Sequence, residues 1–276
     1  FENNNVVSVL YKSTYSESVF TNNMMKHRLL IYTYSNYDYE FHWGKKSIEF
    51  AKSCYGNSRN YIPLKPLWSN KNNINNKKFN KNKIKIVAFS SSFNLNSVNS
   101  NNDNDHLEFL KSLYLLVKQN NFIVYFKSKS PFTNYQFSKN IDLKLLSLDL
   151  IKKLNFKVVD NNHSSVKLIE DSDISISMSF ASTTIEALCL GKKSFYFDGN
   201  NNYPTSEFHT LPYFVCTNKK NIIMYLDYWI NLDDNDLLQF YEKNLKKEFG
   251  NLNFDDDSMT ILKRKILNSI NFKYYI

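Results

Sequence analysis

The chain has 276 residues, of which 42% are hydrophobic and 22% charged, a balance that is typical of a globular protein and excludes wholesale disorder. No apolar run approaches the roughly 18 residues of a membrane-spanning helix, so a transmembrane protein is excluded. The formal net charge of +9 favours an anionic partner, but lysine is scattered along the chain and arginine, which suits phosphate and base recognition best, is scarce.

The three cysteines, Cys54, Cys189 and Cys216, lie far apart in the sequence. An odd number without close pairs fits neither a disulfide framework nor a zinc site, so a reducing, cytoplasmic compartment is expected. Residues 1–5 lack the basic start and apolar stretch of a signal peptide. Because the chain opens with Phe1 instead of Met, we expect it to be a fragment without its natural N-terminus.

The N-terminal part contains two apolar runs rich in β-branched residues, at 6–11 and 28–34, which predict two strands. A further run at 39–44 precedes residues 45–54, whose apolar positions can line one side of a short helix. These elements predict that residues 1–62 form the tail of an N-terminal α/β domain.

Residues 63–83 are predicted to be a linker. Pro63 and Pro66 begin this segment, and a run of Asn and Lys without periodicity completes it. Such a composition is typical of a connection between domains.

Residues 84–276 show apolar runs of strand length that alternate with helical patterns. The predicted strands are 84–89, 122–126, 158–159, 174–178 and 194–197. The predicted helices are 107–117, with Asp105 as N-cap, 141–154, 164–169, 183–190, stopped by Gly191, 220–230, 233–248 and 259–271. This alternation predicts an α/β domain with a doubly wound parallel sheet, which binds ligands at the carboxyl ends of its strands.

The segment from Asp171 to Asp198 joins a strand to a helix through a turn rich in hydroxyl groups. Its hydroxyl side chains near the predicted helix start are Ser179, Ser182, Thr183 and Thr184. The first N–H groups of a helix have no partner within it and carry the positive end of its dipole, so this arrangement suits a phosphate or diphosphate. Glu186, about one turn into the helix, can accept hydrogen bonds from two ribose hydroxyls. The alternative is a capping box, in which Ser182 or Thr183 caps the helix and Glu186 closes back on it.

This segment resembles the C-terminal, donor-binding half of GT-B glycosyltransferases, and bacterial surface-polysaccharide biosynthesis proteins in particular. The resemblance lies in the pattern Ser-Thr-x-x-Glu-Ala-Leu-x-x-Gly-Lys-Lys, which starts at Ser182 and is followed by a strand that ends in Asp198. Further similar positions are Phe41-His42-Trp43-Gly44, residues 63–67, the strand 84–89 with Ser90–Ser92, and the strand end at Lys127 and Lys129.

The resemblance implies a glycosyltransferase that uses a nucleotide-activated sugar in surface-polysaccharide biosynthesis. The hydroxyl side chains at the helix start would hold the phosphates and Glu186 the ribose. Other residues would lie close by, at neighbouring strand ends: Ser90, Ser91, Lys127, Lys129 and Asp198. Asp198 would contact the sugar or cap the turn after it, and the two lysines would bind phosphate or form a solvated pair.

The resemblance also implies a metal-independent reaction in which the nucleotide-sugar is a substrate and no cofactor takes part. The expected partners are this donor and a glycan or lipid-linked acceptor, with no nucleic acid and at most peripheral association with the inner face of the cell membrane. The catalytic residues stay unknown, because the acceptor domain that supplies the base in such enzymes is mostly missing from this chain.

Two other functions are weighed against this one: a nucleotide-sugar epimerase with the same two-domain plan, and a non-enzymatic basic protein that binds nucleic acid. No GxSxG, GxxxxGK[ST] or GxGxxG motif occurs, which removes serine hydrolases, P-loop enzymes and ordinary dinucleotide-binding dehydrogenases. None of the five histidines has the spacing of a metal pair. His163 is predicted to be a surface loop residue, and His42 a packed strand residue.

Overall fold

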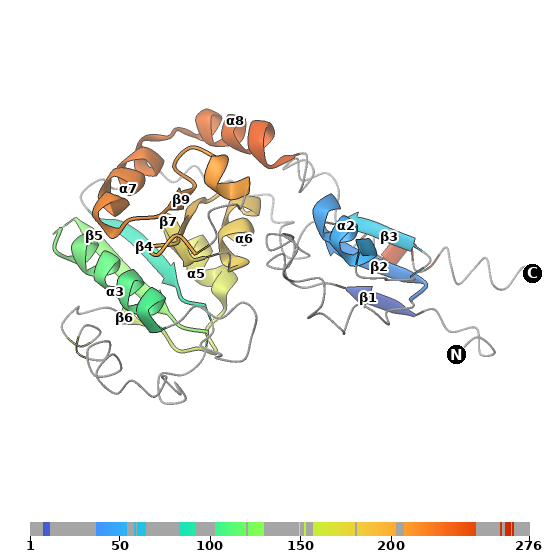
Figure 1. Cartoon of the computed structure of the whole chain (residues 1–276), viewed down its shortest axis with the longest axis horizontal. Helices are drawn as coiled ribbons and strands as arrows, with labels where there is room; N and C mark the ends of the chain where they lie inside the picture. Colours follow the sequence, from blue (N-terminus) through green and yellow to red (C-terminus); the bar gives the residue numbers. More distant parts are fainter. Residues whose placement is uncertain are drawn as a thin grey trace, which may run out of the picture. The chain divides into compact units, whose positions relative to one another are not determined.

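The computed structural model of the chain forms two compact units (Figure 1). The first comprises residues 1–73 and 239–276, and the second comprises residues 74–238. The residues that the structure describes are 8–11, 37–53, 58, 60–64, 83–91, 103–119, 121–129, 149, 152, 157–179, 181–202, 207–246, 260, 263–265 and 267. The predicted strand 28–34, the predicted helix 141–154 except positions 149 and 152, and the predicted linker except residues 63, 64 and 83 lie outside them. Residues 63 and 64 form the end of a strand and not part of a linker.

The first unit contains a three-stranded parallel sheet in the order β1-β2-β3. Its strands are β1 (Val9–Tyr11), β2 (Tyr39–Trp43) and β3 (Asn60–Leu64). Helix α2 (Lys45–Ser53) follows β2 and packs against β2 and β3. Gly44 makes the turn between β2 and α2 with a φ of 81°, a backbone conformation that favours glycine.

A buried polar network joins β2 to α2. His42 is 1% exposed; its Nδ1 lies 3.0 Å from Ser47 Oγ and its Nε2 lies 2.9 Å from Glu40 Oε2. Ser58 donates a hydrogen bond to the other oxygen of Glu40. Since both ring nitrogens have protein partners, the prediction that His42 is a packed strand residue is confirmed.

The second unit contains a six-stranded sheet in the order β6-β5-β4-β7-β8-β9, and every neighbouring pair is parallel. The strands are β4 (Ile84–Phe89), β5 (Phe122–Lys127), β6 (Lys157–Val158), β7 (Ile174–Met178), β8 (Lys193–Phe197) and β9 (Val215–Cys216). If these six strands are numbered 1 to 6 in chain order, starting at β4, their order across the sheet is 3-2-1-4-5-6. This is the order of the doubly wound nucleotide-binding folds, and its direction reverses between β4 and β7. The predicted fold class is therefore confirmed.

Helices cover both faces of this sheet (Figure 1). Those of the second unit are α3 (Asp103–Val117), α5 (Ser165–Asp171), α6 (Thr183–Cys189) and α7 (Ile222–Asn231), with the short 3-10 helices η4 (Glu207–Thr210) and η5 (Lys219–Asn221). α3 packs against α7, and α5 packs against α6. Because crossovers between parallel strands are right-handed, α3, which links β4 to β5, and α6, which links β7 to β8, lie on opposite faces. Helix α8 (Asp234–Asn244) follows α7.

The two central strands β7 and β8 are buried along their whole length, as expected for a sheet with helices on both sides. A hydrophobic cluster joins β4 to α5 and α6, and its buried members are Val87, Phe89, Leu168, Ile169, Ala187 and Leu190. Helix α6 stops at Cys189, and Gly191 follows with a φ of 68°, so the predicted end of this helix is confirmed.

The predicted N-cap of α3 is wrong. The helix begins at Asp103, which places Asp105 inside its first turn. The carboxylate of Asp105 is buried, accepts a 2.8 Å hydrogen bond from Asn202 Nδ2 and accepts a second from Asn200. The side chain thus anchors the turn after β8 to α3 instead of capping its own helix, and this partner is remote in sequence.

Candidate nucleotide-sugar site

All ten predicted site residues lie at one edge of the six-stranded sheet, where its strands end. They comprise Ser90 and Ser91 after β4, Lys127 and Lys129 at the end of β5, Ser179 after β7, Ser182, Thr183, Thr184 and Glu186 at the start of α6, and Asp198 after β8. The set spans the reversal of strand order between β4 and β7. Ligands of open α/β sheets bind at this place, so the topology brings the predicted residues together where a ligand is expected.

The start of α6 is built around a contact between Ser182 and Glu186. Ser182 is the N-cap, but its backbone is helical (φ −58°, ψ −23°) and its side chain makes no capping hydrogen bond. Its hydroxyl donates to Glu186 Oε1 at 2.7 Å. Thr183, the first helical residue, has its hydroxyl 2.7 Å from Ser177 Oγ. The capping box, which was the structural alternative, is therefore not formed.

Glu186 is a buried carboxylate with a lysine in electrostatic range. It is 7% exposed, and burial raises its pKa above the usual value, while the Ser182 hydroxyl and the Lys127 ammonium oppose that rise. Burial likewise lowers the pKa of Lys127, against the attraction of Glu186 and Asp160. A buried carboxylate from α6 and a half-buried cation from β5 thus lie at the same edge of the sheet, where the one can accept hydrogen bonds from hydroxyls and the other can attract an anion.

Asp198 has several protein partners. Its Oδ1 accepts hydrogen bonds from the Ser179 hydroxyl at 3.2 Å and from the backbone N–H of Asn202 at 3.1 Å. Its Oδ2 lies 3.5 Å from Nε2 of His209, in η4. The carboxylate therefore holds the turn over residues 198–202, in which Asn201 adopts a positive φ of 50°. This contact supports the turn-capping alternative for Asp198.

His209 is a residue of this edge that the sequence analysis missed. It lies eleven positions after Asp198, and no spacing rule links a histidine to a carboxylate at that separation. Only the placement of η4 beside the end of β8 reveals the pair.

The other predicted residues differ in their surroundings. The Thr184 hydroxyl donates to the carbonyl of Phe195 at 3.4 Å, in the packing between α6 and β8. Ser90 is buried and its N–H donates to the carbonyl of Lys127 at 3.0 Å, which ties the ends of β4 and β5 together. Lys129 and His163 are exposed, and for His163 this confirms a surface position.

The two lysines of the Gly-Lys-Lys pattern lie at the opposite, amino edge of the sheet. Lys192 Nζ donates to the carbonyls of Glu170 and Ser172 at 2.8 and 3.2 Å. Lys193 Nζ donates to the carbonyl of Ile230 at 3.0 Å and to that of Leu232, and burial lowers its pKa to about 8. These lysines therefore stabilise chain connections and are remote from the predicted phosphate site.

The described part of the chain contains no group of three or more His, Cys, Asp or Glu side chains placed to hold a metal ion. Within the same residues, no helix combines the length and the apolar character needed to cross a membrane.

Residues 2–226 match the family model of the polysaccharide biosynthesis PFTS motif proteins. The chain belongs to this family.

Among solved structures, the fold is similar to that of the wall teichoic acid polymerase TagF. The H444N variant of TagF superposes with a TM-score of 0.53 at 15% identity, over 87% of this chain and 60% of that one. A second TagF structure gives a TM-score of 0.52 at 15% identity, over 86% of this chain and 59% of that one. This chain therefore spans about three fifths of the length of TagF, and the GT-B fold predicted from the sequence is confirmed. No curated protein sequence matches the chain.

Proposed function

We propose that this chain carries the donor-binding part of a glycosyltransferase that takes a sugar from a nucleotide-activated donor in surface-polysaccharide biosynthesis. Membership of a polysaccharide biosynthesis family and a GT-B fold support this proposal. The observation that carries it is the placement of a buried carboxylate, Glu186, and a half-buried cation, Lys127, at the strand ends beside the point where the strand order reverses. Nucleotides bind at this place in doubly wound sheets.

In this proposal Glu186 accepts hydrogen bonds from the ribose hydroxyls, since its carboxylate is held by the Ser182 hydroxyl. Lys127, with Ser90 and Ser91 at the end of β4 and Lys129 beyond β5, approaches the phosphates. Because α6 has only seven residues, its dipole is that of two turns, so side chains supply most of the positive charge.

The hydroxyls of Ser179, Ser182 and Thr183 complete the phosphate side of the site, and Thr184 contributes through its backbone. Asp198 shapes the sugar side through the turn that it holds. We propose that the lysines and hydroxyl groups stabilise the departing nucleoside diphosphate, without a metal ion or a cofactor. The acceptor is a glycan or a lipid-linked glycan, and the reaction takes place in the cytoplasm, with at most peripheral attachment to the membrane.

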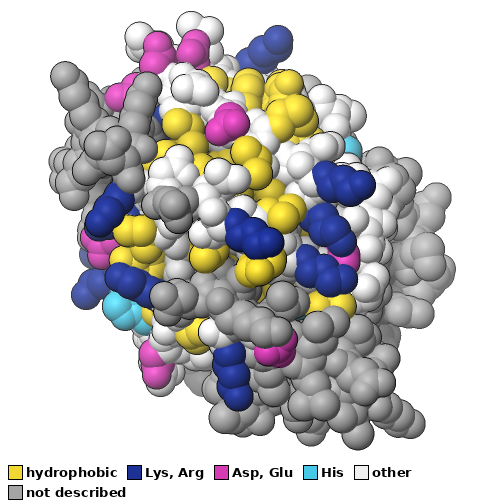
Figure 2. Space-filling model, turned by 90° about the vertical axis from the view of Figure 1, so that its left-hand side faces the viewer, with side chains coloured by type: hydrophobic (Ala, Val, Ile, Leu, Met, Phe, Trp, Pro, Cys, Tyr) yellow, Lys and Arg dark blue, Asp and Glu magenta, His cyan; other side chains and the backbone are white. Residues whose placement is uncertain are grey.

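The two alternative functions have less support. An epimerase needs an acid/base set at the sugar, and of the described carboxylates at this edge Asp198 is engaged by Ser179, Asn202 and His209. On the face that Figure 2 shows, the Lys and Arg side chains of the described residues lie among hydrophobic, acidic and uncharged ones, with a few side by side but no continuous basic surface across these residues. A nucleic-acid interface requires such a surface.

The test is nucleotide binding by the protein and by the Glu186→Gln variant. A nucleoside diphosphate at 100 times its Kd should stabilise the wild-type protein by about 2.7 kcal/mol in a thermal-shift screen of UDP, GDP and CDP. Glu186→Gln should weaken binding about 30-fold, because a hydrogen bond to a charged group contributes about 2 kcal/mol. The free energy of unfolding should change by about 1 kcal/mol or less.

The matched control is Glu242→Gln, which replaces a half-buried carboxylate on α8. This variant should bind nucleotide like the wild type. If no nucleotide stabilises the protein, or if Glu186→Gln binds as tightly as the wild type, the proposed site is wrong.

A further inference from the structure

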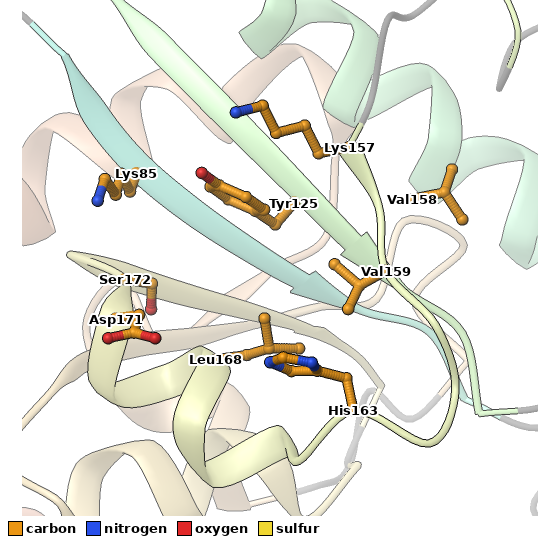
Figure 3. Close-up of a pocket in the computed structure, with 9 residues that line it drawn as sticks. All are labelled: Lys85, Tyr125, Lys157, Val158, Val159, His163, Leu168, Asp171 and Ser172. Atoms are coloured by element: carbon orange, nitrogen blue, oxygen red, sulfur yellow. The ribbon is translucent and has the colours of Figure 1, made fainter.

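A cavity of about 440 Å³ lies on the α5 side of the six-stranded sheet and contains none of the predicted site residues (Figure 3). Its lining residues are Lys85, Tyr125, Lys157, Val158, Val159, His163, Leu168, Asp171 and Ser172. Its volume is in the range of roughly 300–1,000 Å³ that is usual for small-molecule sites.

The cavity follows from the lengths of two elements. Helix α5 has only seven residues and packs against β4 and α6. Strand β6 has two residues and forms the edge of the sheet. Tyr125 of β5, which pairs with Lys157 in β6, therefore lies between α5 and the sheet edge and stays partly exposed.

The cavity has a cationic part and an apolar part. Figure 3 shows Lys85, Tyr125 and Lys157 side by side on three neighbouring strands, and the Tyr125 hydroxyl lies between the two lysine side chains. Leu168 and Val159 lie near one another at the other end. Both belong to the hydrophobic cluster between β4, α5 and α6 or pack against it, so this end is apolar except for the His163 side chain, which Figure 3 shows beside Leu168.

The details of the lining restrict the ligand. Lys157 Nζ lies 5.3 Å from the centre of the Tyr125 ring, over the face on which a nucleobase or a sugar ring would stack. The Ser172 hydroxyl already donates to the carbonyl of Ile169 at 3.0 Å, and Asp171 is exposed at the rim. An anionic head with an aliphatic chain matches the two parts of the cavity, since the lysines lie at one end and Val159 and Leu168 at the other.

We infer that this cavity binds a single-chain lipid phosphate, with the phosphate between Lys85, Lys157 and the Tyr125 hydroxyl and the first carbons of the chain against Val159 and Leu168. This site uses none of the residues assigned to the nucleotide-sugar and stands apart from that proposal. A glycan-building protein with such a site would hold a lipid phosphate on the same domain as the donor.

Calorimetric titration of the full chain with decyl phosphate, below its micelle concentration, tests this inference. We expect saturable binding at one site, and binding at least about tenfold weaker to the double variant Lys85→Gln/Lys157→Gln. Both lysines are exposed, so the double variant should melt at the wild-type temperature. The matched control is Lys167→Gln, which replaces an exposed lysine on α5 that does not line the cavity. This variant should bind decyl phosphate like the wild type.

Three other probes define the ligand. Inorganic phosphate and decyl glucoside should each bind at least about tenfold more weakly than decyl phosphate, and decanoate should bind more weakly than decyl phosphate because its head carries a smaller charge. Equal binding of inorganic phosphate would reduce the site to a patch of surface charge, and equal binding of decyl glucoside would make it an apolar site only. Equal binding of decanoate, no binding of decyl phosphate, or unchanged binding by the double variant would each overturn the inference. Nucleotide affinity should be the same in all these proteins, which separates this result from the donor-site test.

Discussion

The two edges of the six-stranded sheet use similar polar side chains in different ways. At the amino edge, Lys192 and Lys193 donate to four backbone carbonyls, and the Asp173 carboxylate accepts from the backbone N–H of Lys85 at 2.8 Å. At the carboxyl edge, Ser182 donates to the Glu186 carboxylate and Ser179 to the Asp198 carboxylate. Hydroxyls of this edge also donate to backbone carbonyls, Ser179 to Phe197 and Thr184 to Phe195.

We propose that the hydroxyls bonded to carboxylates at the carboxyl edge, unlike the groups bonded to backbone carbonyls, are free to turn toward a ligand. A bond to a backbone carbonyl is part of the fold, because the carbonyl cannot turn to another partner without moving the chain. A hydroxyl that contacts a carboxylate can rotate toward a ligand with little cost. The amino edge therefore stabilises the sheet, and under the proposed function the Ser182–Glu186 contact of the carboxyl edge is the part that a nucleotide would reorganise.

Lys193→Ala at the amino edge is the strongest test of the difference between the two edges. Lys193 is 3% exposed, and its removal leaves the carbonyls of Ile230 and Leu232 without this donor. We expect a loss of about 3 kcal/mol in the free energy of unfolding, measured by urea denaturation. Nucleotide affinity of the folded protein should stay unchanged, and a large loss of affinity would contradict the separation of the two edges.

Gly199→Ala tests how rigidly the turn after β8 is built. A Cβ at this position would lie 2.6 Å from two ring atoms of Phe197, whose ring is 1% exposed and packs against Phe109 with centroids 5.5 Å apart. Because this ring has little room to move, we expect a loss of about 2 kcal/mol in stability, measured by thermal unfolding. Wild-type stability in this variant would show that the turn adapts freely.

Ser182→Ala tests, within the carboxyl edge, whether the hydroxyl of Ser182 serves nucleotide binding or helix capping. Since Ser182 orients Glu186 and caps nothing, nucleotide affinity should fall about fivefold, or about 1 kcal/mol, with a smaller change in stability. The matched control is Ser164→Ala, because Ser164 caps α5 through a bond from the N–H of Lys167. That variant should lose about 1 kcal/mol of stability and keep its nucleotide affinity. If Ser182→Ala instead lost stability and kept its nucleotide affinity, Ser182 would be a helix cap.

The pH dependence of donor binding gives the smallest effect. Burial raises the pKa of Glu186 above 4.5, so the affinity for UDP-glucose, whose phosphates do not titrate in this range, should fall as the pH drops toward that raised pKa. Protonation removes the charge that accepts hydrogen bonds from the ribose hydroxyls.

The folded state also binds this proton more tightly than the unfolded state. The contribution of Glu186 to folding stability is therefore present below pH 4.5 and lost as the pH rises through the raised pKa.

Measuring the pH dependence of UDP-glucose affinity in the wild type and in Glu186→Gln isolates this effect, because the variant lacks the titrating group. An identical pH dependence in both proteins would show that Glu186 does not titrate in contact with the donor.

Local patterns in the sequence predicted the parallel sheet, the end of α6 at Gly191 and the hydroxyl-rich start of α6, and the resemblance to GT-B glycosyltransferases added the residues at neighbouring strand ends. These features depend on hydrophobic periodicity and on the rule that parallel strands end at a common edge, and both can be read without knowing which elements touch. The N-cap role of Asp105 was wrong, because its partners Asn200 and Asn202 lie nearly a hundred residues away.

The sequence by itself determined the order of strands and helices, and with it the position of Glu186 at the start of a helix beside a strand end. Tertiary structure alone decided which groups share that edge: it brings Lys127 of β5 near Glu186, sets His209 beside Asp198 and carries the Gly-Lys-Lys pair to the opposite edge. The physical reason is that periodicity and capping act over a few residues, whereas burial and charge pairing depend on the distances in space that the packing of strands and helices creates.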